Sequence, residues 1–215
     1  MTLTLAVAVG LALAQDCPDY SGDPGLMMSL EEYAGRGALS DDEKACLERH
    51  YAQAPSQTTK DKISRVLMVN GYAYSTSVWL DLVHRHLDEV DRSDPDIAYL
   101  YAYHIFNNSP ERSPEVVAWT EVALERKDVW TGDQFVSRVY GLMKLRTTAA
   151  VHLWKEAEEA TAAGGDLAAS EEARTTVKSY AREWMDFARV AGRSTDEAAA
   201  ICISAASAQA CGISG

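Results

Sequence analysis

Apolar residues recur three or four positions apart along most of the chain. This spacing places them on one face of an α-helix, whereas a half-buried strand would alternate apolar and polar residues. The pattern is clear in three stretches: Ile63, Val66, Leu67, Gly71; Val78, Leu82, Val83, Leu87; and Val177, Tyr180, Trp184, Phe187. No Asn-Gly type of turn joins two alternating runs, so a β-hairpin is not indicated. The pattern therefore predicts an all-α protein.

Capping signals divide this pattern into separate helices. Ser40 precedes three acidic residues, Asp94 is followed by Pro95, and Gly164 opens a Gly-Gly pair. Serine and aspartate are preferred at helix N-caps, proline suits the first turn, and glycine ends helices. Because most linkers are short, consecutive helices should lie antiparallel. We expect about ten helices, at 27–35, 41–53, 59–73, 76–90, 95–107, 114–126, 132–146, 148–163, 170–191 and 195–209.

Tryptophan marks a repeat in the middle of the chain. Trp79, Trp119 and Trp154 lie 40 and 35 residues apart. A period of this size is typical of helix pairs that stack, because one pair cannot bury its own apolar face. We therefore expect these three indoles to pack at the seams between helices.

Three stretches share a further pattern. In each, a large residue is followed directly by a small residue or a methionine, and a tryptophan occurs in the next expected helix. They are Tyr140-Gly141 with Ala149, Trp154 and Ala157; Tyr101-Ala102 with Val116, Trp119 and Ala123; and Leu67-Met68 with Trp79. In this, residues 59–160 resemble tetratricopeptide repeats, which are helix-turn-helix units. The resemblance implies a short solenoid of antiparallel helix pairs over 58–163, with an N-terminal helical cap over 15–57 and capping helices over 164–215.

The resemblance also implies a binding surface, because the first helix of each such pair lines a concave groove that holds a peptide or protein partner. The positions that match are Arg65, Tyr72, Tyr99, Tyr103, Arg138 and Arg146. Arginines beside tyrosines could hold a peptide carboxylate or an acidic segment by bidentate hydrogen bonds and apolar contact. The alternative interpretation is that the arginines pair with carboxylates of the protein itself and the tyrosines are core.

Composition and charge indicate a folded, acidic protein and exclude some classes of binding partner. Of the 215 residues 47% are hydrophobic, which is enough for a packed core. The chain carries 32 acidic against 20 basic residues, a net charge of -12. Such a field repels phosphate backbones and anionic lipid headgroups, so neither nucleic acid nor such a membrane surface is an expected partner. No nucleophile-elbow, Walker or dinucleotide-binding motif is found, and we expect neither enzyme activity nor a cofactor.

The first residues predict export. Residues 2–14 are uncharged and end in Ala12-Leu13-Ala14, which is typical of a signal peptide over 1–14 and of a periplasmic or secreted protein. No Lys or Arg precedes this run, so either the true start lies upstream or the signal is atypical; a short buried helix is the alternative. Later segments are not apolar enough to span a bilayer, and we expect no stable membrane insertion.

Four cysteines, Cys17, Cys46, Cys202 and Cys211, lie near the two ends of the chain. In an exported protein an even number of cysteines favours two disulfides, with three possible connectivities. The first pairing to consider is Cys17–Cys46 with Cys202–Cys211. Nine residues of continuous helix span about 13 Å, too far for a disulfide, so the last helix must break before Cys211 or Cys211 pairs elsewhere. Free buried thiols are the alternative.

One other set of residues suggests chemistry. Asp81, His84 and Asp88 share a helix face at i, i+3 and i+7, a spacing that metal ligands can adopt. An exported helical enzyme or metal-binding protein is therefore the alternative function. The simpler interpretation of this trio is a solvated stripe or an ion pair with Arg85 or Arg92.

Overall fold

The computed structural model describes residues 39–74 and 76–213, with the backbone alone for 69–74 and 76. These residues form eight α-helices and no strand, which confirms the all-α prediction. Within each of the two compact units described below, consecutive helices pack antiparallel, as expected. The expected helix at 27–35 lies outside the described residues. The bounds are α2 (Asp41–Ala52), α3 (Gln57–Tyr74), α4 (Thr76–Glu89), α5 (Pro95–Asn108), α6 (Ser113–Glu125), α7 (Gly132–Ala162), α8 (Leu167–Val190) and α9 (Asp196–Ala205).

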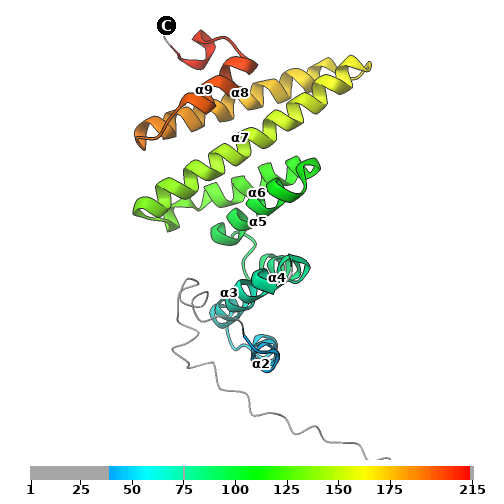
Figure 1. The fold of residues 1–215 in the computed structure, drawn as a ribbon, viewed down its shortest axis with the longest axis vertical. Coiled ribbons are helices and arrows are strands. Elements are labelled where there is room, and N and C mark those ends of the chain that lie inside the picture. Colours follow the sequence, from blue (N-terminus) through cyan, green and yellow to red (C-terminus); the bar gives the residue numbers. More distant parts are fainter. Residues whose placement is uncertain (1–38, 75, 214–215) are drawn as a thin grey trace, which may run out of the picture. The chain divides into compact units, whose positions relative to one another are not determined.

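The chain divides into two compact units, one ending at Asp91 and one beginning at Arg92. In the first unit α2 packs on α3 and α3 on α4. In the second unit α5, α6, α7, α8 and α9 pack in chain order, and α5 also contacts α7 (Figure 1). Within the described ranges no helix is both long and apolar enough to cross a membrane.

Two of the predicted helix starts form as expected. The Ser40 hydroxyl accepts a hydrogen bond from the Glu43 backbone N–H, and the Glu43 carboxylate accepts one from the Ser40 backbone N–H at 2.7 Å. These bonds, that from the Ser40 backbone foremost, lower the pKa of Glu43. Before α5 the Asp94 carboxylate accepts from the N–H groups of Asp96 and Ile97. Each cap satisfies N–H groups that have no partner within the helix.

The break expected between 146 and 148 is wrong, because α7 runs unbroken for 31 residues. Neither glycine nor proline occurs near Thr147 and Thr148. Both threonine hydroxyls instead donate to the carbonyls four residues earlier, those of Met143 and Lys144, as side chains within a helix do. The stretch from Tyr140 to Ala157 therefore lies on one helix and is not a helix pair.

A turn with two glycines ends α7. Gly164 has φ +97, a conformation that a side chain disfavours, and a Cβ on Gly165 would lie 2.7 Å from the Ala160 carbonyl oxygen. This turn joins α7 to the 24-residue α8, the next longest helix (Figure 1). The helix end predicted from the Gly164-Gly165 pair is thus confirmed.

The tryptophans lie at helix seams, as predicted. Trp79 and Trp154 are buried, and the half-buried Trp119 packs edge-on against Tyr101 with ring centroids 5.6 Å apart. That contact joins α6 to α5, so this repeat pattern falls on a helix pair, as does that of Leu67-Met68 on α3 with Trp79 on α4. The core of the second unit centres on Trp184, which is fully buried among residues of α7, α8 and α9.

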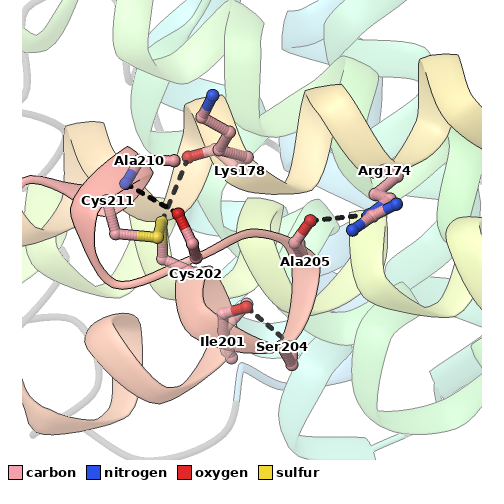
Figure 2. Close-up of a disulfide and its surroundings, with 9 residues drawn as sticks. Arg174, Lys178, Ile201, Cys202, Ser204, Ala205, Ala210 and Cys211 are labelled. Atoms are coloured by element: carbon pink, nitrogen blue, oxygen red, sulfur yellow. Dashed lines mark hydrogen bonds between the residues drawn. A yellow bond between two sulfur atoms is a disulfide. The ribbon is translucent and has the colours of Figure 1, made fainter.

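A disulfide fixes the C-terminal segment to α9. Cys202 and Cys211 are bonded with Cα atoms 6.0 Å apart, and both side chains are buried. The pair forms because α9 ends at Ala205, which meets the condition set by the sequence. Figure 2 shows Arg174 of α8 donating to the Ala205 carbonyl at 2.6 Å, a bond that caps this helix end. Cys46 is disulfide-bonded as well; Cys17, its expected partner, lies outside the described residues.

Replacing both Cys202 and Cys211 by alanine is expected to lower the free energy of unfolding by about 2–3 kcal/mol, because the unfolded chain regains the entropy of a short closed loop. The segment after Ala205 should then become sensitive to protease. Urea denaturation and limited proteolysis measure the two effects. Unchanged stability with unchanged protease resistance would show that the disulfide does not hold this segment.

Candidate functional site

Helix α5 presents one exposed face with an unusual composition. Asp96, Leu100, Tyr103 and Asn107 follow each other at i, i+4, i+7 and i+11 and share a side of the helix. We call these four residues the α5 stripe. Leu100 is 42% exposed and Tyr103 53%. The opposite face carries the residues that pack into the second unit: Ile97, Ala98, Tyr101, Ala102 and Ile105.

Aromatic rings support the stripe from behind. The Tyr99 ring stacks on that of Tyr103 with centroids 6.4 Å apart and meets Trp130 edge-on at 6.5 Å. A Cβ on Gly141 of α7 would lie 3.7 Å from the Tyr99 hydroxyl, so this ring lies against α7. Burial, together with the neighbouring Tyr103, raises the pKa of Tyr99. The stacked rings hold the exposed Tyr103 in a defined orientation.

Arg138 of α7 completes the group. Its guanidinium forms an ion pair with the Asp96 carboxylate and lies over the rings of Tyr99, at 5.7 Å, and Trp130, at 5.3 Å. The Trp130 indole N–H donates to the same carboxylate at 2.8 Å. The structure therefore brings together three of the residues expected in the groove, Tyr99, Tyr103 and Arg138.

Arg146 lies elsewhere, and its expected place beside the tyrosines is corrected. It is five residues beyond Gly141, about 140° around α7. Its guanidinium stacks 4.0 Å above the ring of Tyr180 of α8 and donates to Glu183 at 2.6 Å. Only 9% of the side chain is exposed. The continuous α7 sets this register and turns Arg146 into the seam between α7 and α8.

The Tyr180 hydroxyl, in turn, donates to Glu121 of α6 at 2.5 Å. Burial, then this hydrogen bond, raises the pKa of Tyr180 to about 12. Tyr180 and Arg146 thus join three consecutive helices through charged and aromatic contacts. This is an architectural role.

The two remaining groove candidates belong to the first unit. Arg65 donates through Nε to Asp61, one turn earlier on α3, at 2.8 Å. The side chain of Tyr72 lies outside the described part of the structure.

A Ser-His-Asp group also occurs in the first unit and was not foreseen. The Ser64 hydroxyl lies 3.1 Å from His86 Nδ1, and the Asp61 carboxylate lies 3.9 Å from His86 Nε2. A serine nucleophile needs a hydrogen-bonded base, but it also needs access to the substrate. Ser64 and His86 are fully buried between α3 and α4. The arrangement satisfies buried polar atoms in a helix seam rather than presenting a nucleophile.

The metal-ligand candidates Asp81, His84 and Asp88 all lie on the exposed side of α4. Their ligand atoms do not gather closely enough to share one ion. His86, two residues along the helix from His84, lies on the opposite, buried side of α4. The solvated-stripe interpretation agrees better with this placement than the metal-binding one.

Sequence reasoning did not single out Leu100, Asp96 or Trp130. Trp130 had a signal, because it directly precedes the N-cap Thr131 and Phe135 occupies the fourth helical position. An apolar residue just before the N-cap and another at the fourth helical position often pack together as a hydrophobic staple. For Leu100 the signal was its spacing of three residues from Tyr103. These residues add a carboxylate and an apolar anchor to the expected site.

Comparison of the chain with protein-family models, with curated proteins and with solved structures gave no match in any of the three.

Proposed function

We propose that this chain is an exported interaction scaffold of stacked helix pairs, similar in plan to tetratricopeptide repeats, and that the surface around the α5 stripe binds a segment of a partner protein. The observation that carries the proposal is the exposure of Leu100 and Tyr103 beside each other. Among the described residues the other exposed large apolar side chains are not adjacent to one another, Leu167 and Val190 lying at opposite ends of α8: Val78, Val129, Leu167, Val190 and Ile203. Single exposed apolar residues are ordinary, whereas an adjacent pair on a rigid helix favours binding.

The rigidity of this surface supports the proposal. Tyr103 stacks on Tyr99, which lies against α7, and Asp96 is held by Arg138 and Trp130. A partner would therefore meet side chains that are already ordered and would pay little entropy to fix them. Tyrosine is also one of the three residue types enriched among the residues that dominate the affinity of known interfaces.

The Cys202–Cys211 disulfide supports export, because such bonds persist in oxidising compartments. The proposed signal peptide, 1–14, belongs to the residues that the structure does not describe. Export places the partner among periplasmic, secreted or cell-envelope proteins. Neither a cofactor nor a metal ion enters the proposal.

A photo-crosslinking amino acid at position 107 tests the proposed surface in cells that naturally make the protein. We expect a reproducible adduct with one partner protein, identified by mass spectrometry. The matched control carries the same crosslinker at position 190, where Val190 is 90% exposed as the last residue of α8, outside the α5 stripe. Combining the position-107 crosslinker with Leu100→Ser and Tyr103→Ala should reduce the adduct about tenfold or more.

The same set of proteins contains the result that would defeat the proposal. An adduct that forms equally from positions 107 and 190, or that survives the Leu100→Ser and Tyr103→Ala changes, would mean that the α5 stripe is not the binding surface. Circular dichroism of the purified variants checks that they remain folded.

A further inference from the structure

Arginine, tyrosine and a carboxylate meet in the same way at three helix seams. In each, the guanidinium lies over a tyrosine ring and pairs with an acid three residues from that tyrosine. The three groups are Arg138 with Tyr99 and Asp96, Arg146 with Tyr180 and Glu183, and Arg85 with Tyr51 and Glu48. The expected groove arginine Arg138 therefore already has an internal acid as its partner.

In two of these groups the acid is clearly the outer member, and in the third the two side chains are about equally exposed. The Glu183 side chain is 51% exposed against 9% for Arg146, and Glu48 is 43% exposed against 25% for Arg85. For Asp96 and Arg138 the values are 30% and 25%. Burying a guanidinium stem on an aromatic ring while the carboxylate faces water explains the order. At the Arg146 and Arg85 seams a partner therefore meets the more exposed acid rather than the guanidinium.

The α5 stripe has the same sign of charge. Helix α5 contains no lysine or arginine. Its one histidine, His104, has a pKa lowered by burial and by Arg112, so it is neutral near pH 7. Arg112 itself is held by Glu115 in two hydrogen bonds. Asp96 is the one charged residue of the stripe; its pair with Arg138 is internally compensated, so the stripe presents no uncompensated cation that would repel a cationic segment.

We infer that the partner segment bound at the α5 stripe is cationic: a stretch of polypeptide in which lysine or arginine alternates with apolar residues. This inference rests on the proposed function. It replaces the expectation of an acidic segment or a terminal carboxylate, since Arg138 does not offer an uncompensated charge for one.

The chemistry of the stripe fits such a segment. An apolar side chain of the partner contacts Leu100 and the face of Tyr103. The aliphatic stem of a lysine or arginine lies along the Tyr103 ring and brings its charged end towards the outer edge of the Asp96 carboxylate. The Asn107 side chain, one turn beyond Tyr103, offers a polar contact at the other end of the stripe. A second copy of this chain is a poor occupant, because its net charge of -12 repels another copy.

Fluorescence anisotropy with the full chain tests the inference. The probe is a labelled peptide that alternates lysine with leucine, and its counterpart has glutamate in place of every lysine. We expect the lysine peptide to bind at least about tenfold more tightly, with affinity falling as salt is raised. Tyr103→Ala should weaken its binding about tenfold.

Two variants with the same change of net charge separate a local effect from a general one. Asn107→Lys adds a cation to the stripe, and Val190→Lys adds one at the far end of α8. We expect Asn107→Lys to weaken binding of the lysine peptide about fivefold and Val190→Lys to leave it nearly unchanged. Asn107→Gln controls for loss of the asparagine. This contrast identifies the stripe as the place where the peptide binds.

Other outcomes overturn the inference in distinguishable ways. If the glutamate peptide binds more tightly and loses affinity in Tyr103→Ala, the stripe is a binding surface for an acidic segment; the proposed function then stands and the inference fails. If both lysine variants weaken binding equally, attraction is to the net charge and the inference fails. If neither peptide binds, a cationic segment is not the occupant. The same conclusion follows if the protein self-associates and Tyr103→Ala abolishes that self-association, because the occupant is then a second copy of the chain. Failure of the proposed function is read separately, from the crosslinks at positions 107 and 190.

Discussion

Thr148→Pro is expected to lower the free energy of unfolding by about 3 kcal/mol or more. Thr148 lies in the middle of α7, where its backbone N–H belongs to the hydrogen-bond ladder and its hydroxyl donates to the Lys144 carbonyl at 2.9 Å. Proline removes that N–H and its ring collides with the carbonyl four residues earlier. Because α5, α6 and α8 all pack on this helix, a kink there disturbs the whole second unit.

This substitution separates two arrangements of the same sequence. If a new helix began at 148, proline would stand at its first position, where it is well tolerated. Leu167→Pro is the matched control, since Leu167 is the exposed first residue of α8 and follows an extended Asp166. Thr148→Ala controls for loss of the hydroxyl. Urea denaturation followed by far-ultraviolet circular dichroism measures all three; a Thr148→Pro protein as stable as Leu167→Pro would argue for two helices.

The helices could be predicted from the sequence because their apolar period and most of their ends are local properties. Ser40, Asp94 and Gly164 each act on the residues beside them, and the structure has helix ends at all three places. The continuity of α7 could not be obtained in the same way. The expected break was placed by a repeat length, although residues 146–148 contain no helix-breaking residue. The local signal was the better guide there.

The candidate site was predicted in part for a similar reason. Tyr99 and Tyr103 are four residues apart on one helix, so their common face follows from sequence alone. Arg138 joins the two tyrosines because α5 packs against α7. Arg146 lies away from them because of the register of α7 beyond Gly141. Whether an arginine faces solvent or an internal acid is set by tertiary contacts. The sequence therefore identified residues but not the sign of charge they present.

The C-terminal disulfide requires the last helix to end between the two cysteines, and the sequence alone does not show whether it does. Cys202 and Cys211 can bond only if the helix ends between them. The residues after Ala205, Ala-Ser-Ala-Gln-Ala, contain neither glycine nor proline. The chain nevertheless leaves the helix there, and Arg174 of α8 caps its end. The helix ends here because of tertiary contacts with α8 and the disulfide itself, since the local sequence contains no helix-ending signal.

Trp184→Ala is expected to lower the free energy of unfolding by about 3–5 kcal/mol, the range for a large aromatic side chain removed from a core. Trp184 is fully buried and meets the ring of Tyr140 edge-on at 5.6 Å. It belongs to a core cluster that draws residues from α5 to α9 and includes Cys211 of the C-terminal segment. Removing the indole leaves a cavity that packed helices on several sides cannot easily fill.

Trp184→Phe distinguishes the contribution of the ring from that of its polar atom. The indole Nε1 is buried without a hydrogen-bond partner in the protein, and a buried unpaired donor costs about 1–3 kcal/mol. Phenylalanine removes this donor along with part of the ring. The lost packing and the removed penalty then oppose each other, and we expect a net change within about 1.5 kcal/mol. Urea denaturation of both variants gives the comparison. If Trp184→Phe were as damaging as Trp184→Ala, Nε1 would be making a bond essential to the core, and the unpaired donor inferred at this seam would be wrong.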